Sequence, residues 1–321
     1  MRKRISRALI AATAAGASLS VVGFFAAGPA LASAKFGVSG GTPIATDSNC
    51  TQSSPPVPSD NCGESGYMAS GRDFRFAQAL INIPDHTGSS TADPNLYVAL
   101  DNSGTNTWQY TRVGIAPCTG TSTSATVGPY VVPGVTFYTA NGSASYTCPT
   151  SGWVAYAATA DASGATVSAH AISTAAMGDG VLVNAYLAPT GNGVHTVISI
   201  PSTSTTWNDS FTVSGPAYTD AQAVADWTTT KESGGTGALP AAPTTKTRDA
   251  QFFQGRFTTV SGTAGTFTDG KAWTVNALEA TSNGDLPPSG TLIAQPSYLW
   301  TDGSSYQGKF GDAFGVWRYP F

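Results

Sequence analysis

The chain is poor in charged side chains. Only 11% of its 321 residues are Asp, Glu, Lys or Arg, against about 25% in ordinary globular domains. Residues 1–34 hold four basic residues and no acidic one, so the rest of the chain has 11 basic and 19 acidic residues and a net charge of −8. Because no cluster of Lys or Arg remains there, the composition argues against nucleic acid and anionic membranes as partners.

Long apolar runs are confined to the start of the chain. Arg2, Lys3, Arg4 and Arg7 are followed by a stretch rich in Ala, Leu, Val and Phe, which ends in Ala-Leu-Ala-Ser-Ala at 30–34. This order is typical of a secretory signal peptide, with an uncleaved membrane anchor as the alternative. No later stretch has the about 20 apolar residues that a membrane-spanning helix needs. We therefore expect a soluble, monomeric, extracellular protein once this segment is removed.

The sequence also lacks the short motifs of several enzyme and metal-site classes. It contains no Gly-x-Ser-x-Gly nucleophile turn, no His-Glu-x-x-His zinc helix and no phosphate-binding loop. The three histidines, His86, His170 and His195, are scattered along the chain, and no Cys-x-x-Cys pair accompanies them. We therefore expect neither a metal nor another cofactor.

The four cysteines of the chain are Cys50, Cys62, Cys118 and Cys148. An even number of cysteines in an exported chain indicates disulfides. Three pairings are possible, and we favour Cys50–Cys62 with Cys118–Cys148 because each of these bonds closes a local loop.

Short strand-like runs separated by turn signals extend from residue 66 to the end of the chain. Few helix-forming residues, many Thr, Val, Tyr and Gly, and the lack of helical periodicity favour β-structure. The pattern predicts a single all-β domain of two packed antiparallel sheets over residues 65–321, preceded by a Ser/Thr/Pro-rich segment over 35–64. The expected strands are 74–84, 96–100, 108–115, 128–138, 152–158, 181–187, 195–200, 221–228, 257–260, 273–279 and 314–319.

Five short segments occur along the chain in an order that indicates a family resemblance. They are Ser65-Gly66-Tyr67, Tyr97-Val98-Ala99-Leu100-Asp101, Gly178-Asp179-Gly180, Ala225-Asp226-Trp227 and Asp302-Gly303-Ser304-Ser305-Tyr306. In this order they resemble segments of the eqolisins, the secreted glutamic peptidases. The resemblance covers residues 65–306 and implies the fold of that family, a concanavalin A-like β-sandwich, or jelly roll, with a concave groove.

The catalytic pair of the eqolisins is altered in this chain. The family uses a Glu that activates a water molecule and a Gln that holds the water and stabilises the oxyanion. The resemblance places Asp226 at the position of the Glu and Arg112 at that of the Gln. An acid in the apolar stretch around Asp226 must be paired, hydrogen-bonded or protonated, and a nearby Arg112 would lower its pKa and make it a poor base. A structural ion pair is the alternative interpretation of both residues.

Strand alternation adds three candidate groove-binding residues. It places Gln222 on the face of Asp226, and Trp108 and Tyr110 on the face of Arg112. Aromatic rings beside polar groups can bind sugar rings or an extended peptide, while packing in the core is the alternative for both aromatic residues.

Two further residues are weaker candidates for the site. Gln109 lies three residues before Arg112, and an odd offset in a strand points to the opposite face, so it is a poor substitute for the missing Gln. A retaining glycosidase would need a second carboxyl group near Asp226. Glu279 is the best candidate for that acid, and an exposed residue at a strand end is its alternative interpretation.

These features predict a secreted, eqolisin-like β-sandwich whose groove binds an extracellular peptide or polysaccharide without the standard catalysis of the family. The alternative is a divergent acid endopeptidase, a hydrolase in which Asp226 is the general base. The two hypotheses differ in whether Asp226 takes a proton from water.

Overall fold

The computed structural model describes the parts of the chain that form the strands and their immediate connections. These parts are residues 43–47, 64–84, 94–102, 109–119, 131–132, 135–136, 151–161, 164–172, 179–189, 192–213, 215–226, 247–267, 274–281, 292–298 and 313–318. The predicted signal peptide lies outside them. No helix in these ranges is long and apolar enough to cross a membrane.

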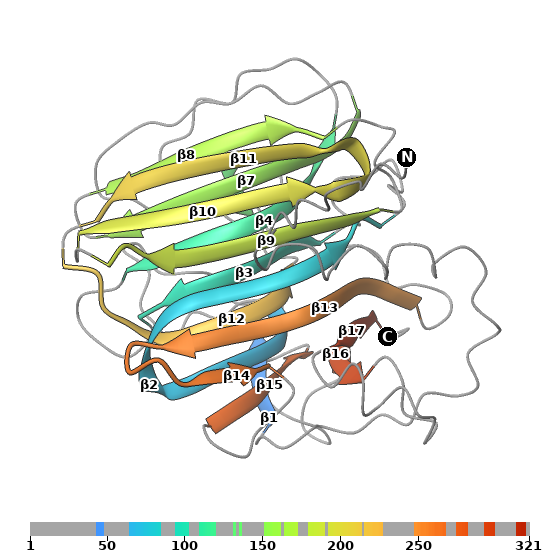
Figure 1. Cartoon of the computed structure of the whole chain (residues 1–321). Coiled ribbons are helices and arrows are strands. Elements are labelled where there is room, and N and C mark those ends of the chain that lie inside the picture. Colours follow the sequence, from blue (N-terminus) through green and yellow to red (C-terminus); the bar gives the residue numbers. More distant parts are fainter. Residues whose placement is uncertain are drawn as a thin grey trace, which may run out of the picture. The chain divides into compact units, whose positions relative to one another are not determined.

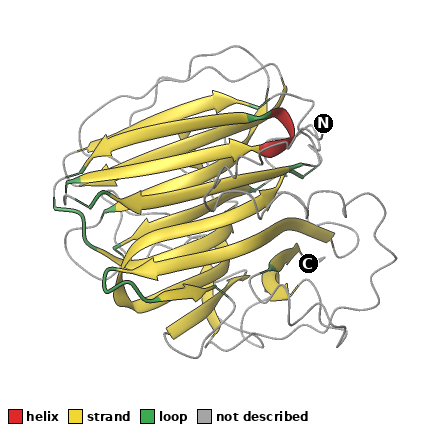
Figure 2. Cartoon of the chain, in the orientation of Figure 1, coloured by secondary structure: helices red, strands yellow, loops and turns green. Residues whose placement is uncertain are grey.

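Fifteen strands form one hydrogen-bonded network that is folded into two layers (Figures 1 and 2). The first sheet has the order β8 (Gly164–Ala171), β7 (Ser151–Asp161), β4 (Tyr110–Thr119), β3 (Asn95–Asp101), β12 (Tyr218–Asp226), β2 (Glu64–Asn82), β15 (Thr274–Thr281) and β1 (Pro43–Asp47). The second sheet has the order β11 (Thr205–Thr212), β10 (Gly193–Ile200), β9 (Gly180–Leu187), β2, β13 (Thr247–Thr259), β17 (Phe314–Arg318) and β16 (Leu292–Tyr298). The short strand β14 (Ala264–Thr266) extends β13, and the 3-10 helix η3 (Pro201–Thr203) joins β10 to β11.

Strand β2 belongs to both sheets because it bends in the middle. Its first part, 64–70, pairs with β12 and β15, whereas its second part, from Phe74 to Asn82, pairs with β9 and β13. Between the two parts Gly71 has a φ of 83°, a backbone conformation that glycine adopts without steric cost. The bend carries the chain from one layer to the other, as Figure 1 shows.

Alternate side chains of both sheets meet in one core. Tyr67, Val98 and Val113 of the first sheet and Val183 and Phe252 of the second are fully buried members of this cluster. Burial of each large apolar side chain stabilises the fold by about 1.5–3 kcal/mol. The described pairings are antiparallel except for that of β1 with β15. The predicted all-β, antiparallel β-sandwich is therefore confirmed.

A polar cluster joins the two edge strands β8 and β11 across the layers. The Ser168 hydroxyl donates to Asp209 Oδ1 at 2.7 Å, and His170 Nε2 lies 3.1 Å from Asp209 Oδ2. The His170 ring stacks on Trp207, with 4.9 Å between the ring centres. These contacts link the two sheets along the side of the sandwich where β8 and β11 are their edge strands.

Several strands differ from the expected pattern. β8, β11, β14 and β16 were not expected, and the segment 35–64 contributes β1, whose partner is β15. Within 128–138 the described residues form a small hairpin of β5 (Val131–Val132) and β6 (Val135–Thr136). Cys50, Cys62 and Cys148 lie outside the described residues and the side chain of Cys118 is not described, so the disulfides stay a prediction.

Candidate functional site

The outer face of the first sheet, opposite the core, brings acidic and basic side chains from four strands together. Glu64 on β2 is directly paired with Asp226 on β12, which is paired with Asn95 on β3. Four residues away along these strands, Gln222 on β12 is paired with Ala99 on β3, and Ala99 with Arg112 on β4. Directly paired residues, and residues two apart on one strand, project from the same face.

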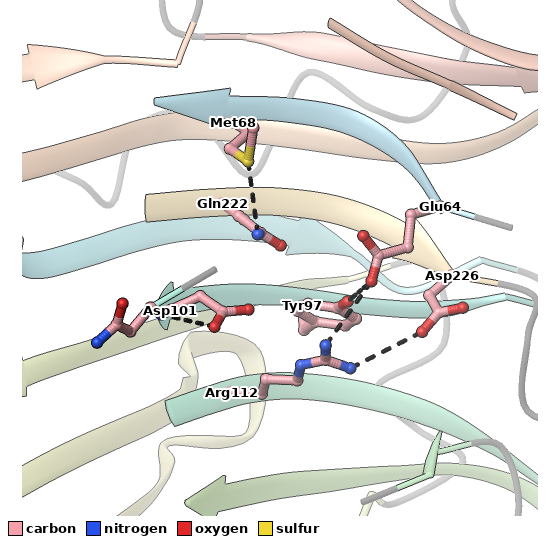
Figure 3. Close-up of polar contacts among 8 residues, drawn as sticks. Glu64, Met68, Tyr97, Asp101, Arg112, Gln222 and Asp226 are labelled. Atoms are coloured by element: carbon pink, nitrogen blue, oxygen red, sulfur yellow. Dashed lines mark hydrogen bonds and ion pairs between the residues drawn. The ribbon is translucent and has the colours of Figure 1, made fainter. Parts of the chain in front are cut away.

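Arg112 lies between two carboxylates at this face. Its Nη2 is 3.7 Å from Glu64 Oε1, and its Nη1 is 3.9 Å from Asp226 Oδ2 (Figure 3). At these distances both contacts are ion pairs rather than hydrogen bonds. The guanidinium carbon also lies 4.7 Å from the ring centre of Tyr97 and 4.8 Å from that of Tyr110, within the range of cation–π attraction. One partly buried cation is therefore shared by two acids and two aromatic rings.

Glu64 holds a proton more readily than an ordinary glutamate. Its pKa is raised from 4.5 to about 7, chiefly by burial and also by the charge of Asp226, while Arg112 and a hydrogen bond from Tyr97 act in the opposite direction. The Tyr97 hydroxyl donates to Glu64 Oε1 at 2.7 Å, and burial raises the pKa of Tyr97 well above its usual value. Glu64 is thus protonated in acidic solution and ionised in alkaline solution.

Arg112 keeps its charge in this setting. Burial lowers the pKa of Arg112, but the nearby Tyr97 and Glu64 outweigh that effect, and the pKa lies well above its usual value. A further acid, Asp101, is paired with Asp220 in the sheet next to Gln222. The pKa of Asp101 is raised to about 6, chiefly by burial and also by Asp220, whereas Arg112 acts in the opposite direction. The cluster therefore gains negative charge as the pH rises through neutrality.

Two glycines let the backbone approach closely around Tyr97. A β-carbon on Gly114 would lie 2.0 Å from the carbonyl oxygen of Leu96 and 2.6 Å from Tyr97 Cβ. A β-carbon on Gly66 would lie 2.2 Å from the carbonyl oxygen of Ala223. Real side chains do not approach the backbone so closely, so the packing of β4 against Tyr97 requires glycine at 114, and the packing of β2 against β12 requires glycine at 66.

The structure brings together most of the residues that the sequence singled out. Asp226 and Arg112 are neighbours, Tyr110 packs on the guanidinium, and Gln222 projects from the same face, with its amide nitrogen 3.7 Å from the sulfur of Met68. Tyr110 and Gln222 are buried, 7% and 1% exposed, and Gln222 Oε1 has no hydrogen-bond partner among the described residues. Trp108 lies outside the described residues.

Of the two weaker candidates, only Gln109 has a described side chain. The side-chain oxygen of Gln109 accepts a hydrogen bond from the backbone N–H of Ala217 at 3.3 Å, away from Arg112. The side chain of Glu279 is not described. No group of three His, Cys, Asp or Glu side chains in the described ranges is placed to hold a metal ion.

Sequence reasoning missed Glu64 as the second acid. It had been assigned to the end of the Ser/Thr/Pro-rich segment, but it is the first residue of β2 and 3% exposed. Two signals were available: glutamate occurs only three times in the chain, and Glu64 shares the strand parity of Gly66 and Met68. Its pairing with Asp226 could not be read from either signal.

Comparison with known proteins gives limited similarity. No protein-family model matches the chain, and no curated protein matches it. A solved structure of scytalido-glutamic peptidase with a transition-state analogue inhibitor is similar over 81% of this chain and 98% of its own, at 13% identity and a TM-score of 0.48. A structure of SCP-B, a member of the eqolisin family of peptidases in complex with the tripeptide Ala-Ile-His, covers the same shares at 14% identity and a TM-score of 0.45. Membership of that family stays a prediction.

Proposed function

We propose that this chain is a secreted β-sandwich protein that binds an extracellular polymer, a peptide or a polysaccharide, and that it lacks glutamic-peptidase catalysis. The observation that carries the proposal is the position of Arg112, 3.9 Å from Asp226 and 3.7 Å from Glu64. At this place an eqolisin-type mechanism needs an uncharged amide that holds water. A permanent cation stabilises the carboxylate anion instead, and a stabilised anion is a weaker general base.

The chemistry of the chain supports binding of a polymer outside the cell. The signal-peptide pattern at 1–34 favours export, and the low share of charged residues leaves a surface built from Ser, Thr, Asn and Gly. Such groups hydrogen-bond to hydroxyl and amide groups without requiring a charged partner. Neutral polysaccharides and extended peptides both offer these groups.

One observation favours a second candidate, a divergent acid endopeptidase with Asp226 as the base. Glu64 lies opposite Asp226 and has a pKa raised to about 7, chiefly by burial. A protonated carboxyl group beside an ionised one is the arrangement by which acid hydrolases divide the roles of acid and base. In this candidate Glu64 would be the acid and Arg112 would stabilise the oxyanion.

Digestion of denatured casein by the mature chain, residues 35–321, at pH 2 to 6 separates the two candidates. We expect no new fragments by mass spectrometry at any pH, for the native protein and for Asp226→Asn alike. Cleavage that disappears in Asp226→Asn but persists in Val260→Ala, a change at a residue 55% exposed, would establish the peptidase and overturn our first proposal.

A further inference from the structure

The outer face of the second sheet carries a row of three rings on three neighbouring strands, and Ser210 on a fourth strand extends the row. Phe76 on β2 is directly paired with Tyr186 on β9, Tyr186 with His195 on β10, and His195 with Ser210 on β11. The rings of Tyr186 and His195 stack, with 5.3 Å between their centres and 29° between their planes. All three rings are partly exposed. With strands about 4.8 Å apart, the three rings span about 10 Å, and Ser210 extends the row to about 14 Å.

A parallel row of amide side chains lies beside the rings. Gln78 on β2 is paired with Asn184 on β9, and Asn184 with Val197 on β10. Val197 is paired in turn with Asn208 on β11, which ends the row. No hydrogen bond in the described part of the chain engages the side chains of Gln78, Asn184 or Asn208. Each amide can donate and accept, so this row offers free hydrogen-bonding groups next to apolar ring faces.

This face is also uncharged from β2 to β11. The third row consists of Leu80, Leu182, Ser199 and Thr206, and none of the three rows contains Asp, Glu, Lys or Arg. Arg256 on β13, paired with Gln78, is the next side chain along the amide row. From β2 to β11 this face therefore complements an uncharged partner, since it carries no Asp, Glu, Lys or Arg there for a polycation or a polyanion.

We infer that the outer face of the second sheet binds an uncharged polysaccharide. The inference rests on the proposed function and narrows it to one ligand class and one surface. A sugar ring has an apolar face of C–H groups, which fits the rings of Tyr186 and His195, and an edge of hydroxyl groups, which fits the amides of Asn184 and Asn208. The chain of sugars lies across the strands, along the row of rings.

An extended peptide fits this face less well than a sugar chain. Peptides that bind to sheets pair with the backbone of an edge strand or enter a groove. Here the backbones of β2, β9 and β10 are paired on both sides within the sheet. On these three strands only side chains, namely rings and amides, remain accessible, and these fit a surface of C–H and hydroxyl groups.

Depletion and affinity-electrophoresis assays test the inference with the mature chain. The probes are insoluble cellulose and chitin, soluble laminarin and xylan in native gels, and immobilised denatured casein. The variants are Tyr186→Ala, Asn184→Ala and the control Val260→Ala, each checked for an unchanged circular dichroism spectrum and melting temperature. We expect binding to at least one uncharged polysaccharide, a loss of affinity of about tenfold in Tyr186→Ala, a smaller loss in Asn184→Ala and no change in Val260→Ala.

The other outcomes separate this inference from the proposed function. Polysaccharide binding that both Tyr186→Ala and Asn184→Ala retain would overturn the assigned surface and leave the function standing. Binding to casein alone would overturn the ligand class and leave a peptide-binding protein. Binding to none of the probes would overturn the inference and the binding function together.

Discussion

Glu64 and Asp226 occupy directly paired positions on β2 and β12, and their carboxylates flank the same guanidinium of Arg112. Two acids this close repel each other when both are ionised, which raises the pKa of one of them. Arg112 offsets part of that repulsion, and burial strengthens both the repulsion and the attraction to Arg112. The balance makes the cluster sensitive to pH and to the loss of any one partner.

Replacement of Arg112 by Gln should destabilise the fold most at alkaline pH. At pH 8 Glu64 is ionised, and removal of the cation from a buried ion pair costs about 3–5 kcal/mol. At pH 5 the protonated Glu64 needs less compensation, so the loss is smaller. Urea unfolding at both values measures the difference, with Arg75→Gln, a change at an exposed arginine of β2, as the control. Equal stability of Arg112→Gln and the native chain at pH 8 would contradict the ion-pair geometry.

The free energy of unfolding should fall as the pH rises from about 4.5 to about 7. The folded pKa of Glu64 is raised from 4.5 to about 7, so in this window the folded state binds more protons than the unfolded state, and stability is lost as they dissociate. Asp101, with a pKa raised from 3.8 to about 6, acts in the same direction. The total change is on the order of a few kcal/mol.

The variant Glu64→Gln isolates the contribution of Glu64 to the dependence of the free energy of unfolding on pH. Its amide cannot titrate, so the dependence of stability on pH between about 4.5 and 7 should flatten, with only the share of Asp101 remaining. An unchanged slope in Glu64→Gln would show that Glu64 does not titrate in this range.

Gly114→Ala should damage the first sheet. Its new methyl group would lie 2.0 Å from the backbone oxygen of Leu96, and relief of such overpacking costs about 1–3 kcal/mol or more. Gly193→Ala is a matched control, because its nearest neighbour, Ala188 Cβ, would be 3.3 Å away. Thermal melting should therefore show a large drop for the first variant and a small change for the second. The reverse order would be incompatible with the register of β3 and β4.

Asp209→Ala should loosen the contact between β8 and β11. The variant removes both the acceptor of the Ser168 hydroxyl and the partner of His170, at a cost of about 1–3 kcal/mol for partly buried groups left unpaired. Asn208→Ala, on the same strand but facing outward, is the control for stability. Hydrogen exchange should become faster in β8 and β11 of Asp209→Ala before it changes in β2 or β12. Unaltered exchange in both edge strands would show that the cluster does not hold them together.

The sequence predicted the fold class because strand signals are local. Runs such as Leu96–Leu100 and Val181–Leu187 alternate or are continuously apolar, and both lie within strands of the structure. The strand β8 was missed because Gly-Ala-Thr-Val-Ser-Ala-His-Ala is rich in small residues with weak strand preference. The strand β11 was missed because Trp207-Asn208-Asp209-Ser210 carries the polar residues of a turn.

The candidate site was predicted in part, since it depends on contacts between distant segments. The neighbourhood of Asp226 and Arg112 followed from the order of motifs. The place of Glu64 depends on the register of β2 against β12, which brings together residues 162 positions apart in the numbering. Burial of Tyr110 and Gln222 also could not be predicted, because strand alternation tells which face a residue occupies but not what that face meets.

The shared contact of Glu64 and Asp226 with Arg112 is tested most directly by a carbon-13 NMR titration of the side-chain carboxyl groups. In the native chain the Glu64 carboxyl should titrate near pH 7, and Arg112→Gln should move that midpoint upward because a cation that favours the ionised form is lost. A Glu64 midpoint near the ordinary value of 4.5, unmoved by Arg112→Gln, would contradict the buried cluster and the account of function built on it.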